Sequence, residues 1–474
     1  MEKLAGVSNR ILKIVGLICL MLIMITLFSE NLGLIAGIVL LIGVFYFLNK
    51  FDVSHKKFLI ILVAVSLLIR VSSVLVINNP QVSDFESILE ISQNFLNGEL
   101  TEKNQSYINE WPFQIYFILF QTLILKIFNK VIFLKLINVI FSIAEICLIY
   151  RVINRISESK KVSQICTTLY AIFINPIIYN SVLSNQHMFL FLVMLAFNLN
   201  FETKFIKNDF IRIGIVALIL SIANLIRPES VVCVLAIIAF TIYMIILKHD
   251  KIKKAIGKIA MLLVIYLILS NISNIVLEKY VPNANREDST LWWKFVVGLD
   301  IENYGQWSEE RYNEFFALHG EDRINYSKER VFKALSDARI LRLFSIKINN
   351  FWNDFSNYFA LGYLYDSGVN ILEKNIEYTE FRNIIDTYDY VIWTVVLILA
   401  FIGIFNKKLN DESKFYLIYL VGTFIMYLFV EVQGRYAFVY RPFVFILAAY
   451  GLLNIIEFIK NKKLINEEKL MRND

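Results

Sequence analysis

Long apolar runs alternate with short charged loops along most of the chain. The runs are continuous, and most approach the length of about 18–20 residues that a helix needs to cross the hydrocarbon core of a bilayer. They predict membrane helices near residues 11–28, 32–48, 57–78, 112–128, 131–150, 162–180, 187–201, 210–226, 230–247, 255–276, 388–405, 415–431 and 436–458. Two hydrophilic stretches, at about 79–111 and 277–387, interrupt this pattern.

Composition narrows the fold class. Of the 474 residues, 57% are hydrophobic and only 19% are charged. A soluble domain does not contain repeated apolar runs of this length, and the strands of a membrane barrel would alternate every second residue. The sequence therefore predicts an all-α polytopic membrane protein.

The distribution of Lys and Arg predicts the topology, because basic loops favour the cytoplasmic side. The basic loops and the basic tail all fall on one side only if the segment 112–128 does not cross the bilayer. This segment is short and begins at Trp111-Pro112, so we expect it to be juxtamembrane or re-entrant. We therefore expect about twelve transmembrane helices in the cell (plasma) membrane, with both termini cytoplasmic.

These features divide the chain into six regions. We expect N-terminal spans (1–78), a first extracytoplasmic loop with juxtamembrane helices (79–130), a central transmembrane bundle (131–276), an extracytoplasmic loop domain (277–387), C-terminal spans (388–458) and a basic cytoplasmic tail (459–474). Residues 308–348 have few helix breakers and predict a small helical domain. In the first loop, apolar residues from Phe85 to Leu96 recur at helical spacing and Gly98 ends the pattern, which predicts a helix that lies on the outer leaflet.

Two carboxylates stand where the third apolar run gives way to this loop. Ser83 and Glu86 have the spacing of a capping box, which is a structural alternative for Glu86. Asp84 is not needed for capping, and a carboxylate just outside a span suits a general base that deprotonates an acceptor hydroxyl. In a helix the two acids point about 200° apart, so they do not form a tight metal-binding pair. Asp84 and Glu86 are the predicted catalytic residues.

Two polar turns between apolar runs are candidates for binding an anion. Arginine supplies a rigid bidentate fork for phosphate, and ionisable groups at membrane depth are usually functional. The alternatives are a snorkelling arginine at the first turn and a Glu–Arg pair that locks two helix ends at the second. The predicted substrate-binding residues are Arg227 and Glu229 in the first turn, and Glu431, Gln433, Arg435 and Tyr436 in the second.

A third turn, Ser184-Asn185-Gln186-His187, falls on the same predicted face. Gln186 and His187 are therefore added as substrate-binding candidates. The alternative for His187 is a capped turn residue in contact with water.

The sequence gives little support to a bound metal or to nucleic acid. The four Cys lie inside apolar runs and the four His are scattered, without the spacing of a zinc site. No cofactor is required by the residues, and a divalent metal, although chemically possible, is not supported by ligand spacing. The formal charge of +6 reflects the basic loops and predicts no nucleic-acid partner.

The order of several short motifs resembles the GT-C superfamily of integral-membrane glycosyltransferases, in particular bacterial family-39-like members of the protein O-mannosyltransferase and aminoarabinose transferase type. The motifs are the acidic opening Ser83-Asp84-Phe85-Glu86, the aromatic-proline entry at Trp111-Pro112, Asn175-Pro176-Ile177-Ile178-Tyr179-Asn180, Leu225-Ile226-Arg227-Pro228-Glu229, Val297-Gly298-Leu299-Asp300 running to Gly305-Gln306-Trp307-Ser308, and Arg435-Tyr436. The chain departs from the pattern by having two spans ahead of the acidic loop and an Asp-x-Glu acidic pair.

The resemblance implies inverting transfer of a sugar from a polyprenyl-phosphate-linked donor to an acceptor on the outer face of the membrane. It implies that Asp84 is the base and that the arginines hold the lipid phosphate. The expected partners are the donor lipid, the lipid bilayer and a glycan, teichoic acid or protein acceptor. The Lys-, Ile- and Asn-rich composition indicates a bacterial source, where the outer face is the cell-wall side.

Two other classes of protein fit the same pattern of spans. A polysaccharide polymerase or ligase also has about a dozen spans and a large external loop. A transporter or flippase for a lipid-linked saccharide would need ionisable groups at mid-span and paired broken helices, and Glu145 is a buried acid of that kind. The acidic first loop favours the glycosyltransferase.

Overall fold

The structure is a computed structural model that describes residues 2–28, 43, 46, 53–77, 79–247, 251–280, 290–361, 369–371, 374–376, 378–406 and 409–471. Eight helices within these ranges are long and apolar enough to cross a membrane. They are α1 (Glu2–Phe28), α3 (His55–Val76), α7 (Ile132–Ser157), α11 (Asp209–Ile226), α13 (Ile252–Tyr280), α19 (Tyr378–Ile404), α20 (Asp411–Phe429) and α21 (Arg441–Met471). The predicted multi-pass helical architecture is confirmed.

Two further apolar helix pairs are sharply bent. In the first, α5 (Glu102–Glu110) turns by 102° into the 3-10 turn η1 (Pro112–Gln114) and α6 (Ile115–Phe128). In the second, α8 (Lys160–Ile172) turns by 56° into α9 (Ile174–Ile178) and η2 (Tyr179–Ser181). The first bend falls at the segment that we expected to be re-entrant or interfacial, and it is the geometry of either a broken span or a re-entrant loop.

The expected number of about twelve spans stays a prediction. Counting each bent pair as one span gives up to ten within the described residues. The helices α10 (Gln186–Asn200) and α12 (Ser230–Ile246) are apolar but shorter than the usual spanning length. The apolar run 32–48 lies outside the described residues.

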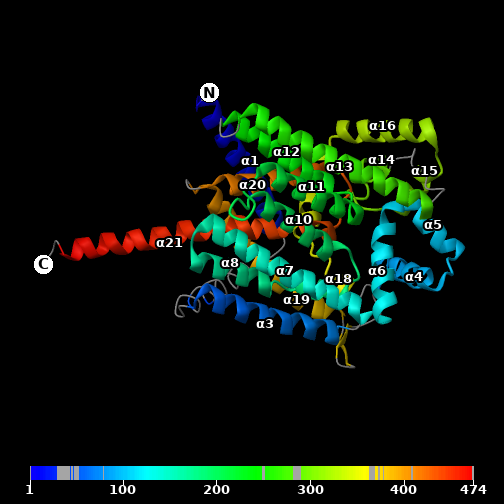
Figure 1. Cartoon of the computed structure of the whole chain (residues 1–474), viewed down its shortest axis with the longest axis horizontal. Coiled ribbons are helices and arrows are strands. Elements are labelled where there is room, and N and C mark those ends of the chain that lie inside the picture. Colours follow the sequence, from blue (N-terminus) through cyan, green and yellow to red (C-terminus); the bar gives the residue numbers. More distant parts are fainter. Residues whose placement is uncertain are drawn as a thin grey trace.

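The centre of the bundle is the close pair α19 and α21 (Figure 1). A Cβ atom built on Gly451 would lie 1.8 Å from the carbonyl oxygen of Leu399, and one on Gly403 would lie 2.6 Å from the carbonyl oxygen of Leu447. The two helices therefore touch through their backbones, as small residues allow in membrane bundles. Trp393 of α19 is fully buried in this core.

The first hydrophilic stretch forms the helix that its spacing predicts. Helix α4 (Asp84–Asn97) ends at Gly98, whose left-handed φ of 76° closes the helix. Its buried residues, among them Ile88 and Ile91, pack with Ile115 and Ile118 of α6 in one hydrophobic cluster. Figure 1 shows α4, α5 and α6 together at one end of the bundle, beside α14 and α15, while the last turns of α21 project from the opposite end.

The second hydrophilic stretch is mainly helical, as expected. It contains α14 (Thr290–Gly298), α15 (Glu309–Phe316), α16 (Gly320–Ser336), α17 (Ile340–Trp352) and α18 (Tyr358–Leu361). A short antiparallel hairpin of β1 (Val369–Ile371) and β2 (Lys374–Ile376), which the sequence analysis did not predict, follows them. Helices α14 and α17 pack on α20, so this region is attached to the bundle.

Candidate active site

Asp84 is the first residue of α4, but not because of the capping box that the sequence suggested. The residue before it, Ser83, has a φ of 55° and makes no side-chain capping hydrogen bond. This backbone conformation is unfavourable for a residue other than glycine and directs the chain sharply from α3 into α4. Glu86, two residues further on, is exposed and lies about 200° around the helix from Asp84, so the two acids do not act as a pair.

The partner of Asp84 comes from the far end of the chain. An oxygen of Asp84 accepts a hydrogen bond of 2.9 Å from Arg435 Nη2, across a sequence separation of 351 residues. Arg435 lies in the 3-10 turn η3 (Gly434–Val439), and its guanidinium also lies 5.2 Å from the ring centre of Phe85 and 5.0 Å from that of Phe359. The Asp84 side chain is 41% exposed and that of Arg435 only 10%, so the carboxylate is the accessible half of the pair.

The second polar turn forms a chain of hydrogen bonds. Arg435 Nε donates to Gln433 Oε1 at 2.6 Å, and Gln433 Nε2 donates to Glu431 Oε1 at 2.8 Å. The other oxygen of Glu431 pairs with Lys294 of α14. The direct Glu431–Arg435 pair that we considered as the structural alternative is therefore not what forms, because Gln433 separates the two groups and Lys294 neutralises the acid.

Three cations surround the ring of Tyr436. The charged groups of Arg227, Lys294 and Arg435 each lie 5.6 Å from its centroid. Cations at this distance are attracted by the face of an aromatic ring. We call Tyr436 and these three side chains the Tyr436 cage. The cage brings the two predicted polar turns together, although nothing in the sequence indicated that they are neighbours.

Arg227 is held from two sides. Its Nη2 and Nε donate to the two oxygens of Glu229 at 2.5 and 3.3 Å, and its Nη1 donates to Asn185 Oδ1 at 3.1 Å. The snorkelling alternative does not apply, because the guanidinium is directed to these partners and only 9% of the side chain is exposed. Glu229 therefore acts as the counter-ion of Arg227 in this structure.

Each cation of the Tyr436 cage has its own carboxylate, and this decides its ionisation. Burial lowers the pKa of Arg227 and of Lys294, but Glu229 beside the first and Glu431 beside the second raise it by more. Burial likewise lowers the pKa of Arg435, while Tyr436 and Asp84 raise it above its ordinary value. All three groups are thus protonated, and the cage holds three fixed cations, each balanced by one carboxylate.

The start of α10 connects these elements. Asn185 receives Arg227 and donates through Nδ2 to the carbonyl oxygen of Ile226 at 3.0 Å. Gln186 Nε2 donates to the backbone carbonyl of Arg435 at 3.5 Å. Asn185 thus contacts the turn after α11, Gln186 contacts η3, and His187 contacts Glu145 of α7.

His187 is fully buried, so the alternative of a turn residue in contact with water is wrong. Its Nδ1 lies 3.0 Å from Glu145 Oε1, and its ring meets the ring of Phe438 edge-on at 4.8 Å between centroids. Since Phe438 belongs to η3, His187 supports the segment that presents Arg435. A direct role of His187 in binding substrate stays a prediction.

The backbone at Gly434, the first residue of η3, leaves no room for a side chain larger than that of glycine. A Cβ on Gly434 would lie 2.2 Å from the carbonyl oxygen of Asp354. Arg441 fixes the same region by donating to four carbonyl oxygens, those of Phe351, Trp352, Asp354 and Gly434. The position of Arg435 is thus set by packing on the 351–354 segment.

Sequence reasoning missed Lys294 and Asn185. In the sequence, Lys294 resembles any other loop lysine. In the structure, a backbone hydrogen bond of 2.9 Å from the Glu431 amide to the Lys294 carbonyl holds it beside the cage. The adjacent Trp292-Trp293 was a usable signal, because Trp293 is fully buried and fixes the orientation of α14. Among the described residues, no group of three or more His, Cys, Asp or Glu side chains could hold a metal ion. The expectation that no cofactor is required stays a prediction.

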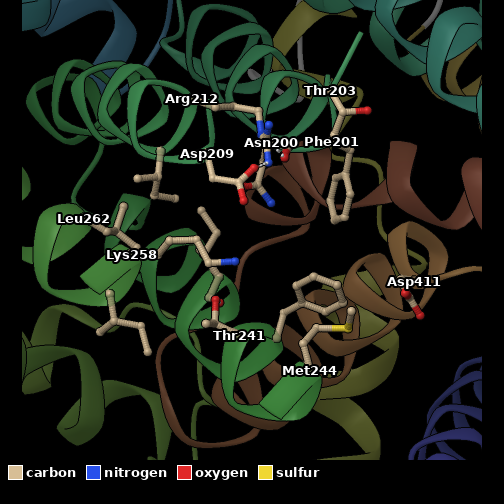
Figure 2. A pocket seen from close by; sticks show the side chains of 14 residues that line it. Asn200, Phe201, Thr203, Asp209, Arg212, Thr241, Met244, Lys258, Leu262 and Asp411 are labelled. Carbon is tan, nitrogen blue, oxygen red and sulfur yellow. Dashed lines mark hydrogen bonds and ion pairs between the residues drawn. The ribbon is translucent and has the colours of Figure 1, made fainter. Parts of the chain in front are cut away.

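Two cavities lie elsewhere, around the ends of α7 and of α10 to α13, and Figure 2 shows the first of them. Neither is lined by Asp84 or by the Tyr436 cage. The candidate active site is defined instead by the cluster of charged side chains around Tyr436 and Asp84.

Comparisons with known proteins give similarity at the level of structure. No family model and no curated protein sequence matches the chain. The chain is similar to the crystal structure of the Archaeoglobus fulgidus oligosaccharyltransferase in the apo form, with 12% identity and a TM-score of 0.44 over 87% of this chain and 52% of that one. It is also similar to the archaeal oligosaccharyltransferase AglB from Archaeoglobus fulgidus in complex with an inhibitory peptide and a dolichol-phosphate, with 14% identity and the same TM-score and coverage.

The chain thus spans about half the length of these two structures. Both are described as oligosaccharyltransferases of Archaeoglobus fulgidus.

Proposed function

We propose that this protein is a membrane glycosyltransferase that moves a sugar from a polyprenyl-phosphate-linked donor to an acceptor on the outer face, with inversion at the sugar carbon. The observation that supports it most is the Tyr436 cage, in which two buried arginines and a partly exposed lysine meet next to an accessible carboxylate, Asp84.

The cage has the chemistry of a phosphate site. Two arginines and a lysine supply several N–H donors to phosphate oxygens, and arginine offers them in a planar fork. A leaving lipid phosphate gains negative charge as the bond to the sugar breaks, and cations fixed in place before the reaction stabilise that charge. The three cations therefore lower the barrier by holding the phosphate that leaves.

Asp84 has the position of the base. In the structure it is paired with Arg435, so a phosphate that binds Arg435 competes for the same guanidinium and releases the carboxylate. The freed carboxylate takes the proton of an acceptor hydroxyl, the hydroxyl oxygen attacks the anomeric carbon, and the bond from that carbon to the phosphate oxygen breaks. The products are the glycosylated acceptor and the lipid phosphate, while the proton stays on Asp84 until water removes it.

A lipid-linked donor suits the surroundings of the site. Asp84 follows α3 by only a few residues and lies among helices that are apolar enough to span a bilayer. A phosphate carried by a lipid reaches such a site by diffusing in the membrane. We propose a hydroxyl-bearing acceptor, a glycan, a teichoic acid or a protein, which approaches from the aqueous side, where Asp84 is exposed.

The replacement of Asp84 by Asn tests this function. Loss of a general base typically slows a reaction by about 10²–10⁴-fold, so we expect sugar transfer from polyprenyl-phosphate sugars by purified Asp84→Asn protein to fall by that order. Binding of the lipid phosphate should persist, since all three cations remain. Glu86→Gln, in the same helical turn but exposed, is the matched control and should keep most of the activity.

Full activity of Asp84→Asn, with the thermal unfolding midpoint unchanged, would contradict the role of Asp84. Equal loss in both variants would show that the general charge of the loop matters and not a single base. Failure of wild-type protein to transfer any of a panel of polyprenyl-phosphate sugars, while it moves such lipids across vesicle membranes, would favour the other class of function.

That second candidate, a transporter for a lipid-linked saccharide, is favoured by one observation. Glu145 is fully buried in α7 and contacts His187 and Tyr170, from two other helices. Arg70, also fully buried, leaves Nη2 without a hydrogen-bond partner among the described residues. Ionisable groups inside a bundle are often part of ion or proton pathways. Transport that is abolished by Glu145→Gln, without any sugar transfer, would support this alternative.

A further inference from the structure

Two cavities adjoin at the end of the bundle that lies farthest from Asp84. The first, of about 280 Å³, is lined by the ends of α10, α11, α12 and α13, and the second, of about 600 Å³, by the end of α7 and the turn after α10. Phe201 and Thr203 line both. The 18 residues of α11 separate Asp209 in the first cavity from Arg227 in the cage, which is about 27 Å at the rise of an α-helix.

The cavities have an excess of positive charge. Five basic side chains and three acidic ones line them. All three acids are engaged with neighbouring cations: Glu202 pairs with Arg151 and Arg155, Asp209 with Arg212 and Lys254, and Asp411 with Lys414. The net charge therefore favours an anionic occupant.

The first cavity is polar on one side and apolar on the other. Figure 2 shows the amine of Lys258 and the hydroxyl of Thr241 directed into the same space, with Phe201 and Met244 across from them. Outside it, Ile211 of α11 and Ile256 of α13 are exposed over 56% and 58% of their surface, as lipid-facing residues of spanning helices are. An occupant with a charged head and an apolar tail would contact both kinds of surface.

We propose that this pair of cavities binds the headgroup of an anionic phospholipid. The phosphodiester lies against the amine of Lys258. The hydroxyl of Thr241, which in the structure donates to the carbonyl oxygen of Ile237 at 2.8 Å, rotates to donate to the phosphodiester. The acyl chains run along the exposed faces of α11 and α13. Basic pockets between membrane helices bind anionic headgroups in this way. A free phosphate would gain the same charge contacts but none of the apolar ones, so the lipid is the favoured source of the phosphate group.

The test uses the full-length protein in nanodiscs of phosphatidylcholine, with and without added phosphatidylglycerol. A ligand that binds only the folded state raises the thermal unfolding midpoint. We expect phosphatidylglycerol to raise it and soluble glycerol 3-phosphate to leave it unchanged. Lys258→Gln should weaken phosphatidylglycerol binding by about fivefold, the usual contribution of one basic residue.

Lys253→Gln is the matched control, because Lys253 is an exposed lysine of the same helix that does not line either cavity. Thr241→Val, which keeps the shape of the side chain, is a second variant should Lys258→Gln fold poorly, and it should also weaken binding. Equal effects of Lys258→Gln and Lys253→Gln would overturn the site in favour of diffuse surface charge. An equal shift with glycerol 3-phosphate would identify a free-phosphate site, and no shift with either would refute the proposal. None of these outcomes depends on sugar transfer at Asp84.

Discussion

Tyr436 is the residue that the three cations of the cage share. The attraction of each cation to the aromatic face is about 0.5–2 kcal/mol, depending on how far it is desolvated, and the ring also fixes the spacing among the three charges. The phenol oxygen has a smaller part, since its hydrogen bond to Glu431 is 3.5 Å long. The ring and the hydroxyl can therefore be separated by mutation.

We expect Tyr436→Phe to keep the KM for the lipid-linked donor within about threefold of wild type, and Tyr436→Leu to raise it by about tenfold or more, because only the second removes the cation–π contacts. Steady-state kinetics with the donor varied at fixed acceptor measures both. A large increase in KM with Tyr436→Phe would show instead that the hydroxyl binds the donor directly.

At the scale of single elements, the first turn of α10 positions both cation-bearing segments. Asn185 holds Arg227, and His187 packs against Phe438 of η3 while bonded to Glu145. His187→Leu would leave a buried carboxylate without this partner, which typically costs about 1–3 kcal/mol. We expect a lower unfolding midpoint together with a several-fold higher KM for the donor and a kcat that changes less.

His319, an exposed histidine in the turn before α16, provides the control, and His319→Leu should change neither quantity. A lower midpoint of His187→Leu with an unaltered KM would mean that the residue supports only the fold. An unaltered midpoint and a strongly reduced kcat would indicate that His187 contacts the substrate directly.

Glu314 of α15 connects α15 to α16 through its bonds to Arg311, Tyr326 and Arg330. The hydrogen bond from Tyr326 depresses the pKa of Glu314 most, and although burial raises it, Arg311 and Arg330 lower it further, to about 2. A carboxyl whose folded pKa is below its unfolded value of 4.5 stabilises the fold at neutral pH and loses that effect as the pH falls from about 4.5 toward 2.

Glu314→Gln should therefore lower stability at pH 7 by no more than about 1 kcal/mol, because the group is partly exposed and screened. The difference in unfolding midpoint from wild type should shrink as the pH is lowered to 3. A difference that does not depend on pH would mean that packing, and not charge, accounts for the effect.

At the scale of the whole molecule, the contact between α19 and α21 fixes the bundle. Gly451→Ala would place a methyl group 1.8 Å from the carbonyl oxygen of Leu399, so the two helices would have to separate. Overpacking of this kind costs about 1–3 kcal/mol, and we expect the unfolding midpoint in detergent to fall by several degrees.

Gly422→Ala is the matched control, because a Cβ at this position of α20 meets no atom within 4 Å. There the greater helix propensity of alanine should leave stability unchanged or slightly higher. A similar loss of stability in both variants would mean that the glycines matter for backbone flexibility and not for the closeness of the helices.

The helices were predictable because the backbone N–H and C=O groups of an apolar segment inside a bilayer need hydrogen-bond partners, and a helix supplies them within the segment. Asp84 and Arg435 were predictable as separate candidates, since charged residues beside apolar runs are expensive. Their pairing was not, because nothing local connects residues 351 positions apart. Lys294 was missed for the same reason. His187 was expected to be a turn residue, but the structure buries it against Glu145, because a turn motif does not show what packs around it.

The pairing of every cation in the cage with its own acid means that the protein supplies a tethered competitor for its ligand. Asp84, Glu229 and Glu431 are present at a high effective concentration that no dilution can lower. Under the proposed function, a phosphate binds by displacing these groups and leaves as they return. The affinity for the spent lipid phosphate would then be limited by the fold, and this limit would allow the carrier to depart and the next donor to enter.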